Sequence, residues 1–535
     1  MVMLKQWMIV QVYDVEKCFD ALWMQECIND LYETGFRNHK LPLLFLENQK
    51  AQIAVKTPHG ISKRIGIENV VMHGTVWGSL FCTTSMDKLG QIAYENEDIL
   101  YKYKNTVNIP SLGMVDDILS IQKCSMDSVK ANAVINAFIE SKKLTLSKSK
   151  CNRIHISKRI PSDDHKCPEL KVHGEKMSNS IKEKYLGDIV DKSGKIRATI
   201  EDRQKKGYAI VAEILAILEE IPLGQHKMEI GLALRQAMLV NGMLYNSEAW
   251  HFISDHEIKM LERVDEHLLR SLVKGHSKLP LEFLYLEAGA MPIKFILKCR
   301  RILYLQTILQ RPEEELTRRV YDAQKRDPLH GDFFQLVKDD FDDIGEEMSE
   351  ARIKQTNREQ FKKEIKEKTR AAAFEYLKNI QSQHSKVKDI KYPKFAVQSY
   401  MTSPIFYNDE VNLLYALRSR YLNVKANFRS KYPNNILCPL CQDKTDDQQH
   451  ILDCSVLKRK CETRETVTNQ CKYEDIFADH KKQKEITHLF SKLIKIRNKL
   501  VDENLCLVSA PSTSAEVLED NDNLPVSIVH YSLGK

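Results

Sequence analysis

Two adjacent carboxylates, Asp116 and Asp117, stand between two short apolar stretches, and they constrain the fold more than any other part of the chain. Residues 110–122 read Pro-Ser-Leu-Gly-Met-Val-Asp-Asp-Ile-Leu-Ser-Ile-Gln. Burying two neighbouring charges is costly, so we expect a turn between two short β-strands at the edge of a sheet. A second apolar run, residues 8–13, ends at Asp14. If the two strands are neighbours, Asp14 and Asp116 meet at one edge.

Carboxylates that face one another repel unless cations lie between them, and Mg²⁺ is a usual cation for oxygen ligands. A pair of such ions, roughly 3.5–4 Å apart, serves phosphoryl and nucleotidyl transfer in many enzymes. Asp14 and Asp116 are therefore the candidate magnesium ligands. An Asp-Asp pair in a loop is common, however, so the pair alone does not establish catalysis.

Composition limits the class of protein. The chain has 535 residues, which is enough for two to four domains. Its content of 43% hydrophobic and 29% charged residues indicates a globular protein. A net charge of +7 is compatible with nucleic acid without requiring it. No stretch approaches the ~20 apolar residues of a membrane helix, and the first residues lack a signal-peptide cleavage site. We expect an intracellular protein, in the nucleus or cytoplasm, with reduced cysteines and no membrane contact.

The hydrophobic pattern changes along the chain. Residues 14–35 and 127–142 have helical periodicity, whereas residues 52–56 and 152–156 are β-like. Residues 196–310 are helical nearly throughout. The following segment is dense in charge, and its lysine-rich run 362–368 predicts an exposed helix face with ion pairs between residues i and i+4.

Five blocks occur in an order that resembles the reverse transcriptases of non-LTR (LINE-type) retrotransposons. Residues 14–20, Asp-Val-Glu-Lys-Cys-Phe-Asp, resemble the first catalytic block of that family. Met-Val-Asp-Asp at 114–117 stands where the family has aromatic-Ala-Asp-Asp. The other three blocks are 73–82 (His-Gly-Thr-Val-Trp-Gly-Ser-Leu-Phe-Cys), 142–151 (Lys-Lys-Leu-Thr-Leu-Ser-Lys-Ser-Lys-Cys) and 185–187 (Tyr-Leu-Gly). Each block alone is weak, and their order carries the resemblance.

The resemblance implies an α+β fold: a right-hand polymerase palm, with an antiparallel sheet and packed helices, followed by a mostly α-helical thumb and a C-terminal region with a small zinc knuckle. Only 13 residues precede Asp14, so we expect the fingers and an N-terminal endonuclease to be missing, as in a truncated copy. The expected parts are a palm (1–195), a thumb (196–330), a charged helical region (331–425), a zinc knuckle (426–475), a C-terminal helix (476–506) and a disordered tail (507–535).

The resemblance also implies a reaction, RNA-directed DNA synthesis. Asp14 and Asp116 would hold two Mg²⁺ ions, and Asp117 would support the site. The partners would be an RNA template, a DNA primer and deoxynucleoside triphosphates.

Four further residues receive roles from the same resemblance. Phe19 matches the bulky residue that excludes a 2′-hydroxyl, and Lys150 could reach the triphosphate. Gly74 would let the backbone approach the template base pair, because it has no Cβ. His73 replaces the family's usual glutamine, which leaves its contact to the substrate open.

In the expected thumb, basic residues at 203–206 would contact phosphate without reading sequence. Arg300 and Arg301 would do the same, or would pair with an acidic residue such as Glu287.

A second constellation lies near the C-terminus, where Cys438, Cys441, His450 and Cys454 have the spacing C-x2-C-x8-H-x3-C. This spacing suits a tetrahedral structural Zn²⁺, and reduced structural thiols are the alternative. It resembles the Cys-Cys-His-Cys motif of the same retrotransposon proteins. Basic residues flank this motif, and they predict either a contact with nucleic acid or simply a solvated surface. They are Lys425, Arg429, Lys431, Lys458, Arg459 and Lys460.

Three hypotheses remain at this point. The first is a reverse transcriptase palm and thumb with a zinc knuckle, and the second is a non-catalytic nucleic-acid-binding remnant of such an element. The third is a helical scaffold in which the Asp-Asp pair is incidental, and it requires Asp14 and Asp116 to lie far apart. The sequence leaves open the template, the target site, the oligomeric state and the role of residues 331–425.

Overall fold

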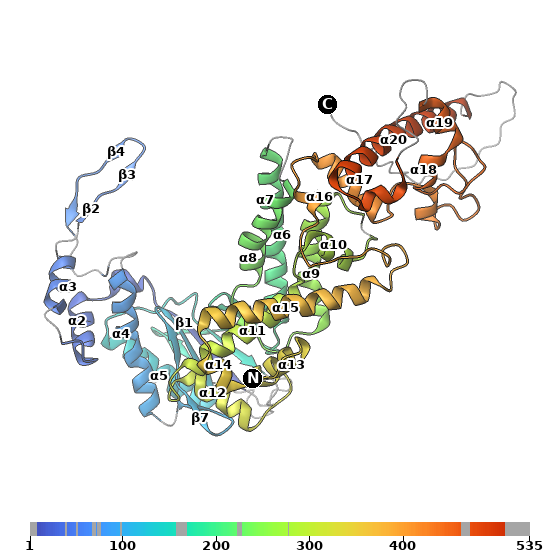
Figure 1. Ribbon diagram of the computed structural model, residues 1–535. Helices are drawn as coiled ribbons and strands as arrows, with labels where there is room; N and C mark the ends of the chain where they lie inside the picture. Colours follow the sequence, from blue (N-terminus) through green and yellow to red (C-terminus); the bar gives the residue numbers. More distant parts are fainter. Residues whose placement is uncertain are drawn as a thin grey trace, which may run out of the picture. The chain divides into compact units, whose positions relative to one another are not determined.

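The protein, seen here in a computed structural model, forms two compact units, residues 1–408 and 409–535. Each is described by itself (Figure 1). The finer division of the chain expected from the sequence stays a prediction. The structure describes residues 8–37, 40–49, 52–66, 71, 76–96, 99–156, 168–221, 227–276, 278–461 and 471–508.

A five-stranded sheet organises the first unit. Strand β1 (Met8–Asp14) lies at its centre and pairs antiparallel with β9 (Asp117–Gln122) and β10 (Asn152–Ile156). Residues 8–13 of β1 are all buried, because both faces of the sheet are covered, and this explains their nearly continuous apolar run. The edge strands are β8 (Leu112–Met114), antiparallel to β9, and β13 (Ser178–Asn179), parallel to β10.

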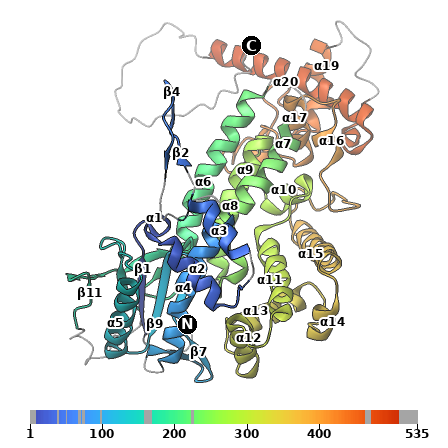
Figure 2. The same cartoon turned by 90° about the vertical axis from the view of Figure 1, so that its left-hand side faces the viewer.

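Successive side chains of β1 point to opposite faces of the sheet, as in any β-strand, and the two faces pack against different residues. Gln11 donates a 2.9 Å hydrogen bond to the Ser128 carbonyl, and the Tyr13 hydroxyl donates a 3.0 Å bond to Asn132. Both partners belong to α5 (Ser125–Ser141), which lies beside the sheet in Figure 2. Met8, Val10 and Val12 instead join a core with Tyr101 and with Ala323 of α12 (Leu316–Arg326).

The helical stretch expected after Asp14 is interrupted. It forms α1 (Cys18–Ala21) and α2 (Met24–Glu33), because Leu22 and Trp23 between them are extended, with ψ angles of 130° and 119°. Leu22 is buried in the core, and this tertiary contact overrides the local periodicity. Further along are α3 (Lys40–Gln49) and α4 (Val76–Glu95).

The strand expected at 52–56 is also different. It consists of two short strands, β2 (Gln52–Ile53) and β3 (Lys56–Thr57), which pair with β5 (Ile65–Gly66) and β4 (Gly60–Ile61) outside the main sheet. Three other small antiparallel pairs complete the strands: β6 (Tyr101–Tyr103) with β7 (Val107–Ile109), β11 (Lys171–Val172) with β12 (Glu175–Lys176), and β14 (Lys182–Tyr185) with β15 (Asp188–Asp191).

The described part of residues 196–310 is helical nearly throughout, which confirms the sequence prediction. A buried ion pair joins two of these helices: Arg235 donates two bonds of 2.6 Å to Asp265, which also accepts one of 2.9 Å from Tyr285. The elements are α6 (Arg197–Glu220), α7 (Lys227–Leu234), a π-helix (Arg235–Val240), α8 (Asn241–Met243), a 3₁₀ turn (Ser247–Ala249), α9 (Asp255–Val273), α10 (Leu281–Ala288) and α11 (Ile293–Gln310).

The arginines of this region make internal contacts instead of the expected phosphate contacts, whereas Lys205 is exposed. Arg203 is buried and donates bonds of 3.0 Å to the Gly187 carbonyl and to Asp188, so it fastens the β14–β15 hairpin to α6. Arg301 pairs with Asp340 at 2.7 and 2.9 Å, so the alternative of an acidic partner holds for it, with Asp340 in place of Glu287. Arg300 donates a hydrogen bond to the Leu244 carbonyl, and the Tyr392 and Tyr400 hydroxyls donate to Glu287.

The charge-dense segment forms α13 (Phe333–Asp343), α14 (Glu350–Gln355), α15 (Arg358–Gln381) and α16 (Ser399–Thr402). Its ion pairs differ from the expected i,i+4 series: Lys368 of α15 reaches Glu346 at 2.6 Å, before α14. Lys362 pairs with Glu359, three residues earlier, at 3.6 Å. Lys368 therefore joins α15 to the segment before α14, whereas the Lys362 pair lies within α15.

The second unit includes α17 (Asn408–Arg418), α18 (His450–Asp453), α19 (Ser455–Cys461) and α20 (His480–Val508), with 3₁₀ turns at Lys425–Phe428 and Tyr473–Phe477. The expected C-terminal helix is thus present as α20, and Ile486 and Phe490 of its inner face are fully buried. The expected disordered tail lies, from residue 509, outside the described residues. No described helix is long and apolar enough to span a membrane.

The end of α10 generates a prediction for stability. Gly289 has φ +56°, and a Cβ there would lie 2.2 Å from the Val397 nitrogen, whereas Gly345 has φ +70° and open space. We expect Gly345→Ala to cost about 1 kcal/mol, the cost of a left-handed alanine, and Gly289→Ala about 3 kcal/mol or more because backbone must also shift. Thermal melting of the two variants checks this, and equal melting temperatures would contradict it.

A second prediction concerns pH. Burial raises the pKa of Glu262 in α9 to about 7, with Asp265 and Glu282 adding to the rise and Lys294 opposing it. The folded state therefore holds this proton more tightly than the unfolded state, and the stabilisation present below about pH 4.5 is lost as pH rises through 7. We expect Glu262→Gln to match the wild type at pH 4 and to exceed it at pH 8, by at most about 3 kcal/mol. Melting curves at both pH values test this, with the exposed Glu219→Gln as the control that should leave the pH dependence unchanged.

Candidate functional site

The turn between β8 and β9 holds the Asp-Asp pair, as the sequence predicted. In the register of these strands Met114 faces Asp117, so Val115 and Asp116 make a two-residue turn. Val115 has φ 62°, and tight hairpin turns use positive φ at this position because it matches the twist of the strands. For a β-branched residue this conformation costs about 1–3 kcal/mol. Pairing of β9 with β1 holds the strained turn in place.

The three aspartates meet at one edge of the sheet. Asp14, the last residue of β1, faces Asp117 across the β1–β9 pair, and the Val15 amide donates a 3.3 Å hydrogen bond to the Asp116 carbonyl. The hypothesis of a helical scaffold with an incidental Asp-Asp pair required these residues to lie far apart. The structure excludes that arrangement.

The electrostatics of this edge are those of crowded negative charge. Burial raises the pKa of Asp117, and the carboxylates of Asp116 and Asp14 raise it further. Lys150 is the nearby cation: its ammonium lies 3.2 Å from both Asp14 oxygens, and this hydrogen bonding raises the pKa of Lys150. A bound cation would relieve the same repulsion.

An open cavity of about 490 Å³ borders this edge. The segment 147–150 forms one wall, and the Ser147 amide fixes it to β1 through a 2.8 Å hydrogen bond to the Asp14 carbonyl. The sequence interpretation had identified Lys150 there, but it missed the two serines, whose signal is the alternation Ser-Lys-Ser-Lys after a buried Leu146. The lining residues are Asp14, Val15, Glu16, Lys17, Asp116, Ser147, Lys148, Ser149 and Lys150.

The other residues predicted for the substrate are only partly described. Phe19 lies in α1 and packs against the core that surrounds α2 and α4, and it is not among the residues that line the cavity. The Val71 amide donates a 3.3 Å bond to its carbonyl. His73 and Gly74 lie outside the described residues.

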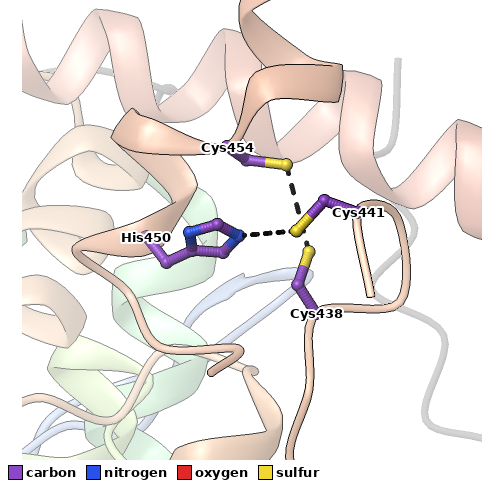
Figure 3. Close-up of side chains that lie close together, drawn as sticks. All are labelled: Cys438, Cys441, His450 and Cys454. Carbon is purple, nitrogen blue, oxygen red and sulfur yellow. Dashed lines mark hydrogen bonds between the residues drawn. The ribbon is translucent and has the colours of Figure 1, made fainter. Parts of the chain in front are cut away.

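The four predicted zinc ligands come together in the second unit (Figure 3). Their ligand atoms all lie within 4.8 Å of one another, with 4.0 Å between the sulfurs of Cys438 and Cys454 and 3.3 Å from Cys441 Sγ to His450 Nε2. Sulfurs around a tetrahedral Zn²⁺ are about 3.8 Å apart, given Zn–S bonds of about 2.3 Å. Among the described residues this is the one group of three or more His, Cys, Asp or Glu side chains that converges in this way.

The local backbone explains this convergence. The Cys438 amide donates to the Lys444 carbonyl at 2.8 Å and the Gln442 amide to the Cys438 carbonyl at 3.0 Å, which closes a tight loop that presents two sulfurs. His450 begins α18, and Cys454 follows its last residue.

The chemistry of the donors also fits zinc. Burial works against the Cys441 thiolate, but the backbone amides of Asp443 and Lys444, with His450, lower the pKa of Cys441 to about 6. Burial raises the pKa of Cys438 to about 11. A zinc ion would hold both as thiolates, the form in which cysteine binds metal.

Comparison with known proteins does not identify a family for this chain. No family model matches the chain, and no curated protein matches it. Among solved structures, the chain is similar to the telomerase of Candida albicans in complex with a TWJ fragment of telomeric RNA, with 12% identity and a TM-score of 0.28 over 65% of this chain and 50% of that one. The chain thus spans half of that protein. So weak a similarity defines no family, and the function has to be inferred from the sites themselves.

The Cys/His cluster generates a test by metal removal. We expect one zinc ion per chain, and we expect Cys438→Ser to lose it and to lower the melting temperature, because binding energy at such a site is folding energy. Elemental analysis of the purified protein measures the metal. Cys461→Ser, a buried cysteine outside the cluster, is the control that should keep the ion. Metal-free wild-type protein with unchanged melting after Cys438→Ser would favour reduced structural thiols.

Proposed function

We propose that the protein is an RNA-directed DNA polymerase, a reverse transcriptase of the kind found in non-LTR retrotransposons. The observation that carries the proposal is the meeting of Asp14 and Asp116, from segments a hundred residues apart, at one sheet edge that lines a cavity also lined by Lys150. Two carboxylates, a cation and an open cavity of about 490 Å³ form a suitable setting for a nucleoside triphosphate.

In this proposal Asp14 and Asp116 hold two Mg²⁺ ions, and Asp117 keeps the negative charge of the edge high. When bound, such ions activate a primer 3′-hydroxyl and neutralise the charge of the departing pyrophosphate. The chain itself positions the ligands: both lie beside backbone that is hydrogen-bonded within the sheet or to the segment 147–150.

Lys150 then serves as the mobile cation of the site. Its side chain is 67% exposed, and its ammonium lies 3.2 Å from Asp14. An ammonium on a flexible stem can leave a carboxylate for a phosphate group of similar charge. Lys150 would bind the triphosphate when its ammonium leaves Asp14.

The remaining roles stay predictions within this proposal. Phe19 would exclude ribonucleotides, and His73 and Gly74 would contact the nucleotide and the template. Residues 1–195 would serve as the palm and 196–330 as the thumb, with RNA template and DNA primer as partners. Zinc at Cys438, Cys441, His450 and Cys454 would have a structural role, and the neighbouring basic residues 458–460 would contact nucleic acid.

The second candidate function is a non-catalytic nucleic-acid-binding protein derived from such an element. The ion pair between Lys150 and Asp14 favours it, because both oxygens of a proposed metal ligand already accept hydrogen bonds from an internal cation.

Primer extension distinguishes the two functions. We expect the wild type to extend oligo(dT) on poly(rA) with Mg²⁺ and dTTP, and we expect Asp116→Asn to lose at least about 10²-fold in rate, because stabilisation of developing charge is lost. Asp389→Asn, at an exposed position outside the site, is the matched control and should keep full activity. If neither wild type nor variant extends a primer that both bind, the non-catalytic function is correct.

A further inference from the structure

Residues 52–66 form a two-stranded ribbon in which every described residue is exposed. Strands β2 and β5 pair Ile53 with Ile65, and β3 and β4 pair Lys56 with Ile61. Between these pairs, the Ser62 amide donates a 2.9 Å bond to the Val55 carbonyl, so the two halves make one ladder. Figures 1 and 2 show the ribbon as a narrow, separate hairpin.

The ribbon exposes much apolar surface. The exposed fractions are 53% for Ile53, 57% for Val55, 72% for Ile61 and 70% for Ile65. Ile53 and Ile65 are cross-strand neighbours, so together with Val55, two residues further along the strand, they present one apolar face. A two-stranded hairpin without a packed face is marginally stable in water, so a partner that covers this surface would stabilise it.

The charge of the ribbon indicates which partner. Lys56, Lys63 and Arg64 are all exposed, and the sequence has no acidic residue between Glu47 and Glu68. In the register, the single Ala54 faces both Lys63 and Arg64, which is the arrangement of a β-bulge. A bulge turns the side chains of the longer strand and increases the twist. Three cations therefore project from a twisted, apolar ribbon with no acidic neighbour on it.

We infer that this ribbon is a docking element for double-stranded DNA, which it enters through the major groove. A groove about 12 Å wide admits a two-stranded ribbon, and exposed aliphatic groups can contact thymine methyl groups there. The three cations would then lie near phosphates on both sides of the groove. An RNA duplex fits poorly, because its major groove is deep and narrow. The inference does not depend on the proposed polymerase activity.

The test uses the full chain and a fluorescent DNA duplex, with anisotropy measured over a range of salt concentrations. The triple variant K56A/K63A/R64A removes the ribbon cations. The triple variant K388A/K391A/K394A removes the same charge from exposed lysines before α16. We expect only the ribbon variant to bind more than about 10-fold more weakly at low salt. Its slope of log affinity against log salt should fall by about 2.7, since each phosphate contact contributes about 0.9.

Three outcomes would overturn the inference. Equal losses in both triple variants would mean a general charge effect, and unchanged binding by the ribbon variant would mean that the duplex binds elsewhere. Ribbon-dependent binding of an RNA duplex of the same sequence, as tight as that of DNA, would exclude docking in the DNA major groove.

Further measurements separate DNA docking by the ribbon from self-association and from catalysis. Ile65→Ser keeps all charges, and we expect it to weaken DNA binding with an unchanged salt slope. A dimer in sedimentation that Ile65→Ser dissociates, without loss of DNA affinity, would assign the ribbon to self-association instead. Anisotropy measures DNA docking without catalysis, so a failure of primer extension and a failure of DNA docking remain distinguishable.

Discussion

The candidate carboxylate site depends on the pairing of β1 with a strand on each side. Backbone hydrogen bonds to β9 and β10 fix the register, and the two faces of β1 are buried against separate groups of side chains. A slip by one residue would exchange the faces, placing Gln11 where an apolar side chain now packs. The register therefore determines where β1 ends. The packing of residues 8–13 places Asp14 beside the turn that contains Asp116.

Features that depend on a few neighbouring residues could be predicted from the sequence. The Asp116-Asp117 turn follows from the cost of burying adjacent charges, and the approach of Cys438 to Cys441 follows from their short spacing. Lys150 required the family resemblance, because nothing local distinguishes it from other lysines. Ser147 was missed, since its contribution comes from a backbone bond to a strand far away in the sequence.

The wrong expectations concern residues whose partners are distant in the sequence. Arg203 looked like an exposed phosphate ligand, but Asp188 and the hairpin turn beside it make it a buried structural residue. The periodicity after Asp14 predicted a longer helix, which the burial of Leu22 interrupts. In both cases the local pattern was correct for an isolated segment, and a tertiary contact decided the outcome.

The strained turn at Val115 also affects binding. A flexible loop would have to lose conformational freedom when a ligand arrives, and that loss weakens affinity. Here the turn is already restricted by β8 and β9, and the energy that holds a valine at positive φ comes from folding of the sheet. Any ion or polar molecule that reaches Asp116 therefore meets a preorganised carboxylate. A glycine at position 115 would relax the backbone and give up part of that preorganisation.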